Sequence, residues 1–142
     1  MKVATFNINN INKRLDNLLA WLAKAEPDVV SLQELKAEQD AFPVNALRTL
    51  GYEAVWHGER SWNGVAILAR HHVPVLTRTS LPGNPEDQQA RYIEAAVQGV
   101  LITSIYLPNG GWPGLNSCPE FTFEGAPSKL SLGGFFWFGP HL

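Results

Sequence analysis

The stretch that decides the fold is PDVVSLQE, residues 27–34. Its apolar run is short, starts after a Pro-Asp break and ends on polar residues, which is typical of a buried strand. Before it, leucines recur at helical spacing and predict an amphipathic helix over residues 11–25. Residues 2–7 read as a further strand, so the order strand, helix, strand predicts a right-handed crossover with parallel strands.

Two polar residues close these strands. Asn7 ends the first strand and Glu34 follows the second. The carboxyl ends of parallel strands meet at one edge of a sheet, where open α/β sheets place their ligands. We therefore expect a functional site at this edge, although an isolated Glu or Asn at a strand end is more often solvated or part of a turn.

The chain continues to residue 110 as short elements separated by turns rich in Gly, Asn, Pro and His. These turns favour an antiparallel meander after one more helix. The expected helix covers residues 43–50, and the expected strands cover residues 52–57, 64–70, 73–79, 91–97 and 100–106.

Composition limits the class of protein. With 142 residues, 45% of them hydrophobic, the chain has enough apolar material for one core. The lone Cys118 cannot form an internal disulfide, and the start lacks a signal-peptide pattern, so we expect a cytoplasmic setting and no membrane span. The net charge of −2 indicates no general affinity for nucleic acid, so any polyphosphate must be held by local side chains or a bound cation.

Residues 111–142 have a different composition. They are rich in Gly, Pro and aromatic residues, show no helical or strand period, and contain only Glu120, Glu124 and Lys129 as charged residues. We expect a domain over residues 1–110 and a separate tail over residues 111–142. Our hypothesis is that the tail is an out-of-frame translation.

Six strings carry a resemblance to a known family. They occur in family order and at family spacing, and together they resemble exodeoxyribonuclease III-like members of the exonuclease-endonuclease-phosphatase superfamily. The strings are FNIN (6–9), PDVVSLQELK (27–36), GYEAVWHG (51–58), NGVAIL (63–68), QARYIE (89–94) and SIYLPNG (104–110).

The resemblance implies a four-layer α/β sandwich, with mixed sheets and outer helices, that hydrolyses phosphate esters with Mg²⁺ or Mn²⁺. It also implies a DNA repair nuclease, a 3′ to 5′ exodeoxyribonuclease and abasic-site endonuclease. Its partner would be duplex DNA with an abasic site, a nick or a 3′ end.

The family's later Gly-Asp-x-Asn and Ser-Asp-His motifs are absent. We therefore expect an incomplete sandwich that is nearly inactive alone and has an exposed sheet edge able to self-associate. The alternative is a non-catalytic fragment, or a weak cation-binding or DNA-binding module, that needs a partner half. The oligomeric state stays open.

The resemblance also assigns roles to residues of the predicted edge. Glu34 is similar to the family's cation ligand, and Asn7 to the residue that orients the cation and the reactive water. Tyr106 is similar to the tyrosine that contacts the scissile phosphate; without its flanking Pro-Asn-Gly it would read as a core residue.

Four further residues are candidates for substrate binding, and each has a plainer explanation. Arg91 resembles the family arginine beside the DNA backbone, but a surface ion pair is nearly as common there. Lys36 is either a phosphate contact or a solvated charge, and Asn9 either a site residue or part of a turn. Trp62 either stacks on a base or packs in a turn.

Overall fold

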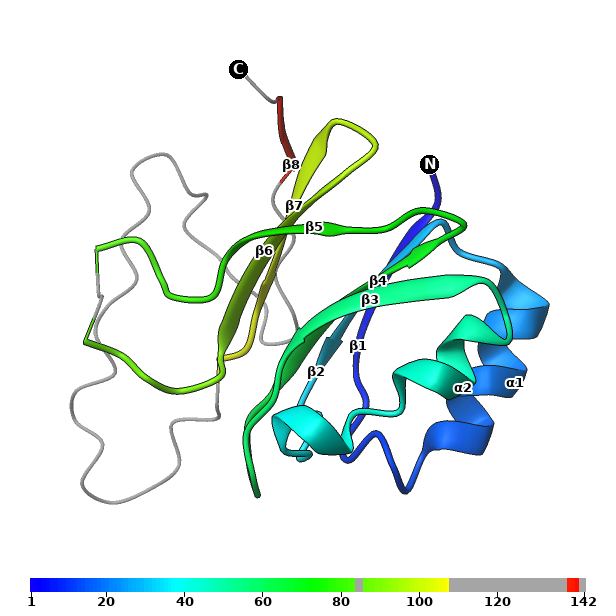
Figure 1. The fold of residues 1–142 in the computed structure, drawn as a ribbon, viewed down its shortest axis with the longest axis horizontal. Coiled ribbons are helices and arrows are strands. Elements are labelled where there is room, and N and C mark those ends of the chain that lie inside the picture. The colour runs from blue at the N-terminus through cyan, green and yellow to red at the C-terminus, as the bar shows by residue number, and fades with distance from the viewer. Residues whose placement is uncertain (84–85, 108–137, 141–142) are drawn as a thin grey trace.

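The computed structural model describes residues 1–83, 86–107 and 138–140 (Figure 1). Strands dominate, and the helices are short. The elements are β1 (Val3–Asn7), α1 (Leu15–Ala25), β2 (Val29–Gln33), η1 (Gln39–Ala41), α2 (Val44–Arg48), β3 (Tyr52–His57), β4 (Val65–Arg70), β5 (Val75–Arg78), β6 (Tyr92–Val97), β7 (Val100–Ile105) and β8 (Phe138–Pro140).

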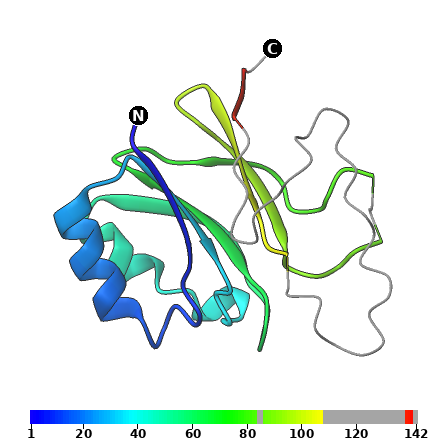
Figure 2. The ribbon, with the colours of Figure 1, turned by 180° about the vertical axis from the view of Figure 1, so that it is seen from behind.

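The strands form two sheets of four. The first has the order β1-β2-β4-β3, and the second has the order β5-β6-β7-β8. Strands β1 and β2 are parallel, whereas β4 pairs antiparallel with both β2 and β3. Figures 1 and 2 show α1 and α2 on one side of the first sheet and the second sheet on the other. The predicted class, an incomplete α/β sandwich with a mixed sheet and outer helices, is confirmed.

The complete burial of β2, whose sequence is VVSLQ, follows from its place between two cores. Val30 and Leu32 belong to the core that the first sheet shares with the helices, where they join Leu18 of α1. Val29 belongs to the core between the two sheets, together with Ile93 of β6. Successive side chains of a strand point to opposite faces, so a strand covered on both faces is apolar at nearly every position.

A small polar layer lies between the sheets. The hydroxyl of Ser31 on β2 donates to that of Ser104 on β7 over 2.6 Å. The side-chain amide of Gln33 donates to Ser31 (2.9 Å) and to Thr5 of β1 (3.0 Å). These hydrogen bonds compensate the desolvation of the buried groups and fix the two sheets against each other.

Two expectations about the elements are wrong in detail. The first helix begins at Leu15 and not at residue 11, because Asn9 and Asn10 have positive φ angles and turns lead into the helix. The expected meander is interrupted: β4 already has β2 and β3 as neighbours. The next strand, β5, therefore cannot pair with β4 and instead belongs to the second sheet.

The expected tail falls mostly outside the described residues. Its described part, β8, pairs antiparallel with β7, with Phe138 opposite Ile102. The sequence pattern predicted no strand there. In the part of the chain that the structure describes, no helix is long and apolar enough to cross a membrane.

Candidate functional site

The site begins where the two parallel strands end. Asn7 is the last residue of β1 and stands in register with Gln33, the last residue of β2. Glu34 follows directly. The side-chain amide of Asn7 donates to Oε1 of Glu34 over 2.6 Å. The structure thus brings together the two residues that the crossover placed at one sheet edge.

The second sheet contributes Tyr106, which follows β7. Its hydroxyl donates to the same Oε1 of Glu34 over 2.8 Å. The backbone N–H of Tyr106 bonds to the carbonyl of Arg91 (2.8 Å), which holds the residue beside the start of β6. One carboxylate oxygen therefore accepts hydrogen bonds from both sheets.

Lys36 occupies the other side of the carboxylate. Its Nζ lies 3.0 Å from Oε2 of Glu34 and donates to Oδ1 of Asn9 over 2.7 Å. The N–H of Asn9 in turn donates to Oδ1 of Asn7 (3.0 Å). The side chains of Glu34 and Lys36 are only 18% and 19% exposed, so solvent screens this ion pair less than a surface pair.

These contacts set the charge of the site. Burial tends to raise the pKa of Glu34, but the hydrogen bonds from Asn7, Lys36 and Tyr106 outweigh it and hold the pKa below the ordinary value. Burial, and then the bond to Glu34, raise the pKa of Tyr106 to about 12. At neutral pH the site therefore contains an ionised carboxylate and a neutral phenol.

The backbone at the site is unusual. The φ angles of Asn9, Glu34 and Lys36 are +47°, +54° and +49°, in the left-handed region that residues other than glycine rarely adopt. Hydrogen bonds to the neighbouring loop hold this conformation, because the N–H groups of Leu35 and Lys36 donate to the carbonyls of Gly64 (3.1 Å) and Asn63 (2.9 Å). Such conformations cluster at functional sites.

The remaining two candidates behave differently. Trp62 is 74% exposed, so it packs little in its turn, and Nζ of Lys36 lies 5.5 Å from its ring centroid. Arg91 pairs with Asp87 over 2.7 Å. Its guanidinium donates to Asp87, and its backbone carbonyl accepts the N–H of Tyr106. The sequence left two roles open for Arg91, a contact with the DNA backbone and a surface ion pair. In this structure Arg91 forms the ion pair.

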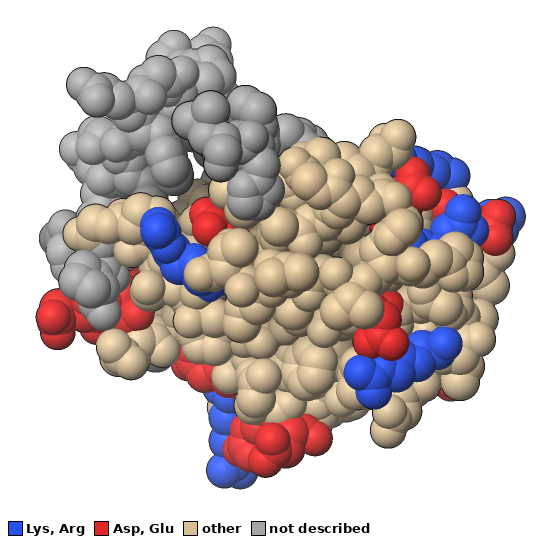
Figure 3. Space-filling view, turned by 45° about the horizontal axis from the view of Figure 1, so that its top comes forward, with Lys and Arg blue, Asp and Glu red and all other residues tan. Residues whose placement is uncertain are grey.

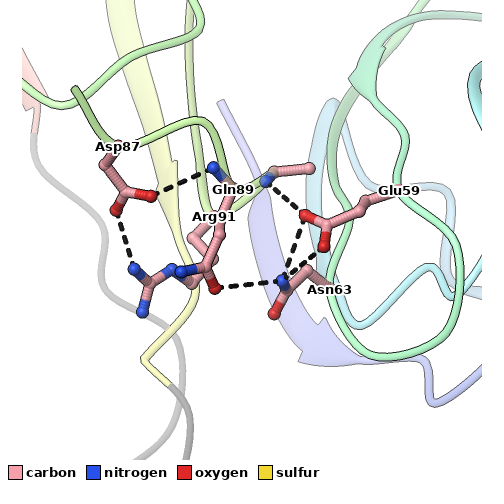
Figure 4. Close-up of polar contacts among 6 residues, drawn as sticks. Glu59, Asn63, Asp87, Gln89 and Arg91 are labelled. Atoms are coloured by element: carbon pink, nitrogen blue, oxygen red, sulfur yellow. Dashed lines mark hydrogen bonds and ion pairs between the residues drawn. The ribbon is translucent and has the colours of Figure 1, made fainter. Parts of the chain in front are cut away.

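Beside the site lies a group of loop residues, the loop cluster, made of Glu59, Asn63, Asp87, Gln89 and Arg91 (Figure 4). Sequence reasoning singled out only Arg91 among them as a candidate. Asn63 is 7% exposed, an unusual burial for a loop amide. Scattered polar residues in loops have no periodicity, and only the turn signal of Asn63-Gly64 was readable.

The donor set suits a hard cation. An ionised carboxylate with a neighbouring amide oxygen is the kind of site that Mg²⁺ occupies while keeping most of its waters. The ammonium of Lys36 on Oε2 shows that the carboxylate already attracts positive charge. Within the described ranges, no three His, Cys, Asp or Glu residues gather as a ready metal cage.

The charged surface offers no broad electrostatic platform on the face drawn in Figure 3, where basic and acidic side chains lie in small separate groups. Several basic residues are paired, as Arg48 is with Glu53 (3.0 Å) and Arg70 with Glu26 (2.8 Å). This fits the expectation from net charge that phosphate would be held by local contacts.

Comparison with known proteins agrees with this fold. The profile of the Endonuclease/Exonuclease/phosphatase family matches residues 4–129, and the chain belongs to this family. Among the curated proteins it is 38% identical over 114 residues to an exodeoxyribonuclease III of Haemophilus influenzae, an alignment covering 78% of this chain and 42% of that protein.

Solved structures give the same result. A 3′-5′ exonuclease from Neisseria meningitidis superposes with a TM-score of 0.75 at 43% identity, covering 83% of this chain and 45% of that one. An AP endonuclease from Archaeoglobus fulgidus superposes with a TM-score of 0.70 at 35% identity, covering 76% and 41%. The chain thus spans less than half the length of these relatives.

Proposed function

We propose that this chain carries the cation-binding residues and part of the phosphate-binding residues of a Mg²⁺-dependent or Mn²⁺-dependent DNA repair nuclease. The proposed activities are 3′ to 5′ exodeoxyribonuclease and abasic-site endonuclease on duplex DNA with an abasic site, a nick or a 3′ end. The observation that carries the proposal is the ionised Glu34, held by Asn7, Lys36 and Tyr106. The names of the relatives support the choice of DNA.

In this proposal Glu34 holds the cation, with Asn7 orienting it. A bound divalent cation polarises a phosphoryl oxygen and lowers the pKa of bound water. Tyr106 stays protonated at neutral pH. Its hydroxyl donates a hydrogen bond to an oxygen of the scissile phosphate, where negative charge develops. The lowered pKa of Glu34 keeps the ligand ionised.

DNA contacts are proposed for residues around this centre. Lys36 and Asn9 present an ammonium and an amide to a phosphate, and Trp62 presents an exposed ring on which a base can stack. The guanidinium of Arg91 must leave Asp87 before it can bind a phosphate of the DNA backbone. We therefore assign Arg91 a smaller share of the DNA-binding affinity. A cytoplasmic location and the boundary at residue 110 stay predictions.

One observation favours the second candidate, a cation-binding or DNA-binding module completed by a partner half. Among the described strands, β1 is at the edge of its sheet. The backbone carbonyl of Lys2 and the backbone N–H of Ile8 form hydrogen bonds with β2. Because the backbone groups of successive residues point to opposite sides of a strand, the N–H and C=O groups of Val3 and Thr5 face away from β2. A groove of about 590 Å³ lies along β1 and α1, lined in part by Phe6. An open edge of this kind accepts another strand, from a partner half or from a second copy.

The first experiment tests whether Asn7 and Glu34 bind a divalent cation. Titration of the isotope-labelled chain with Mn²⁺, followed by NMR, should broaden the signals of Asn7 and Glu34 first. The variant Glu34→Gln should abolish this effect, whereas Glu53→Gln, which removes a partly exposed carboxylate paired with Arg48, should leave it unchanged.

Cleavage of abasic and nicked duplex with Mg²⁺ then decides between them. Turnover that is lost in Glu34→Gln supports the nuclease, and cation binding without turnover supports the incomplete module. Turnover that survives in Glu34→Gln would overturn the assigned site.

A further inference from the structure

Glu59 lies in the loop between β3 and β4 and accepts hydrogen bonds from two other positions. Its two carboxylate oxygens each lie 3.0 Å from the side-chain amide nitrogen of Asn63. Its Oε2 also accepts the backbone N–H of Ala90 over 2.7 Å. Figure 4 shows the carboxylate facing Asn63 on its own loop and the chain around Gln89 that precedes β6. One side chain therefore ties together loops of the two different sheets.

On the first sheet, this tie continues to Glu34. The carbonyls of Asn63 and Gly64 accept the N–H groups of Lys36 (2.9 Å) and Leu35 (3.1 Å). These are the two residues that follow Glu34, whose backbone is in the left-handed region. The position of Asn63 therefore fixes the loop that carries the carboxylate and the ammonium of the site.

On the second sheet, the tie continues to Tyr106. Ala90, whose N–H bonds to Glu59, is followed by Arg91, whose carbonyl accepts the N–H of Tyr106 over 2.8 Å. The carbonyl of Ala90 also accepts the N–H of Gly64 (2.9 Å), so the two loops are joined directly as well. Glu59 thus sits between the backbone that carries Glu34 and the backbone that carries Tyr106.

We propose that Glu59 is a positioning residue that sets the distance between Tyr106 and Glu34. It acts through Asn63 on one side and Ala90 on the other and does not itself touch the site. A role in DNA cleavage rests on the proposed function, whereas the positioning of Tyr106 does not.

A carboxylate suits this place because all its partners are N–H donors. Ala90 is 1% exposed and Asn63 is 7% exposed. Without Glu59, the N–H of Ala90 and much of the amide of Asn63 would be buried without an acceptor, and the loops would separate to admit water.

The test follows Tyr106 itself and needs no catalytic activity. The hydroxyl of Tyr106 donates to Oε1 of Glu34 over 2.8 Å, so its ring carbon bearing oxygen reports this contact. In the chain labelled with ¹³C at that carbon and held at neutral pH, the Tyr106 signal in Glu59→Ala should move toward the position it takes in Glu34→Ala, where the hydrogen bond is lost. Glu53→Ala, on the same strand-loop unit but paired with Arg48, should leave the signal unchanged.

A paired exchange distinguishes positioning from a general loss of stability. Glu59→Gln places an amide donor against the amide of Asn63, and Asn63→Asp places two carboxylates together, so each single change should shift the Tyr106 signal in the same direction as Glu59→Ala. The double change Glu59→Gln with Asn63→Asp again sets a donor against an acceptor and should restore at least half of the shift. A Tyr106 signal unchanged in Glu59→Ala, or no recovery in the double variant, would overturn the proposal. If Tyr106 responds as described but no variant cleaves DNA, only the proposed function fails.

Discussion

The hydroxyl of Tyr106 and the carboxylate of Glu34 lie 2.8 Å apart, although they follow strands of different sheets and are separated by 72 positions in the sequence. The contact couples the two ionisations: the phenol lowers the pKa of Glu34, and the carboxylate raises that of Tyr106. The geometry of the site therefore depends on how the two sheets pack. Predictions about either residue test that packing as well.

Removal of the Tyr106 hydroxyl should weaken the hold on Glu34. In Tyr106→Phe we expect the pKa of Glu34 to rise, because one of its three donors is lost, and cleavage, where present, to fall by about 10²-fold. Carboxyl ¹³C NMR measures the pKa. Tyr92→Phe is the matched control, since the Tyr92 hydroxyl also donates to a carboxylate, that of Glu94 over 3.0 Å. Equal shifts of Glu34 in both variants would contradict the prediction.

Glu34 should stabilise the fold in a pH-dependent way. Its folded pKa is below the ordinary value of 4.5, so its contribution is fully present above that value and is lost as the pH falls through the folded pKa. Glu34→Gln should cost about 1–3 kcal/mol at neutral pH, and this difference should shrink in acid. Urea unfolding at several pH values measures it. A difference that grows on acidification would reverse the sign and refute the assignment.

The close approach of two loops makes Gly64 sensitive to a methyl group. Its φ is +104°, and an added Cβ would lie 2.7 Å from Cβ of Leu35, which is fully buried. Gly99 has a φ of +77° and no atom within 4 Å. We expect Gly99→Ala to cost about 1 kcal/mol from the backbone alone and Gly64→Ala about 2–4 kcal/mol. Equal losses in urea unfolding would mean that the loop around Leu35 yields easily.

The polar layer between the sheets should behave as a coupled unit. Ser31→Ala and Ser104→Ala each remove one hydroxyl from a 2.6 Å hydrogen bond and should cost about 1–2 kcal/mol. The double variant should cost less than the sum by about 1 kcal/mol, because the second change removes a group already left without its partner. A double-mutant cycle by thermal unfolding measures this coupling, and strict additivity would argue against it.

Trp62 should serve binding and not stability. Because it is 74% exposed, Trp62→Ala should change the free energy of unfolding by less than about 0.5 kcal/mol. Loss of one stacked base should weaken DNA binding by about 5- to 100-fold, as measured by fluorescence anisotropy. Val75→Ala, which shortens a 62% exposed side chain on β5, is the control for surface apolarity. Unchanged DNA affinity would assign Trp62 to its turn alone.

The sequence predicted well the features that depend on local pattern. The apolar period of α1 and the buried run of β2 identified the crossover, and the parallel register then placed Asn7 beside Glu34. Tyr106 was reached only through the family resemblance, because its contact with Glu34 depends on packing between sheets, which no local period encodes.

Other features could not be derived in this way. The start of α1 depends on the positive φ of Asn9 and Asn10, and asparagine signals such a turn without fixing its position. The contacts of Glu59 join loops of different sheets, and the pairing of Arg91 with Asp87 lies within one irregular loop before β6. A charged residue in a loop has the same appearance in a sequence whether it faces solvent or receives a buried N–H.

The left-handed backbone at Glu34 has a consequence for protein engineering. At a φ of +54°, glycine or asparagine would relieve the conformational cost that a glutamate incurs. The same substitution would leave Asn7, Lys36 and Tyr106 without their acceptor, so the two effects oppose each other and selection for heat resistance alone puts only weak pressure on this carboxylate. Directed evolution of this chain therefore needs a screen for cation binding at every round if the proposed metal site is to be kept.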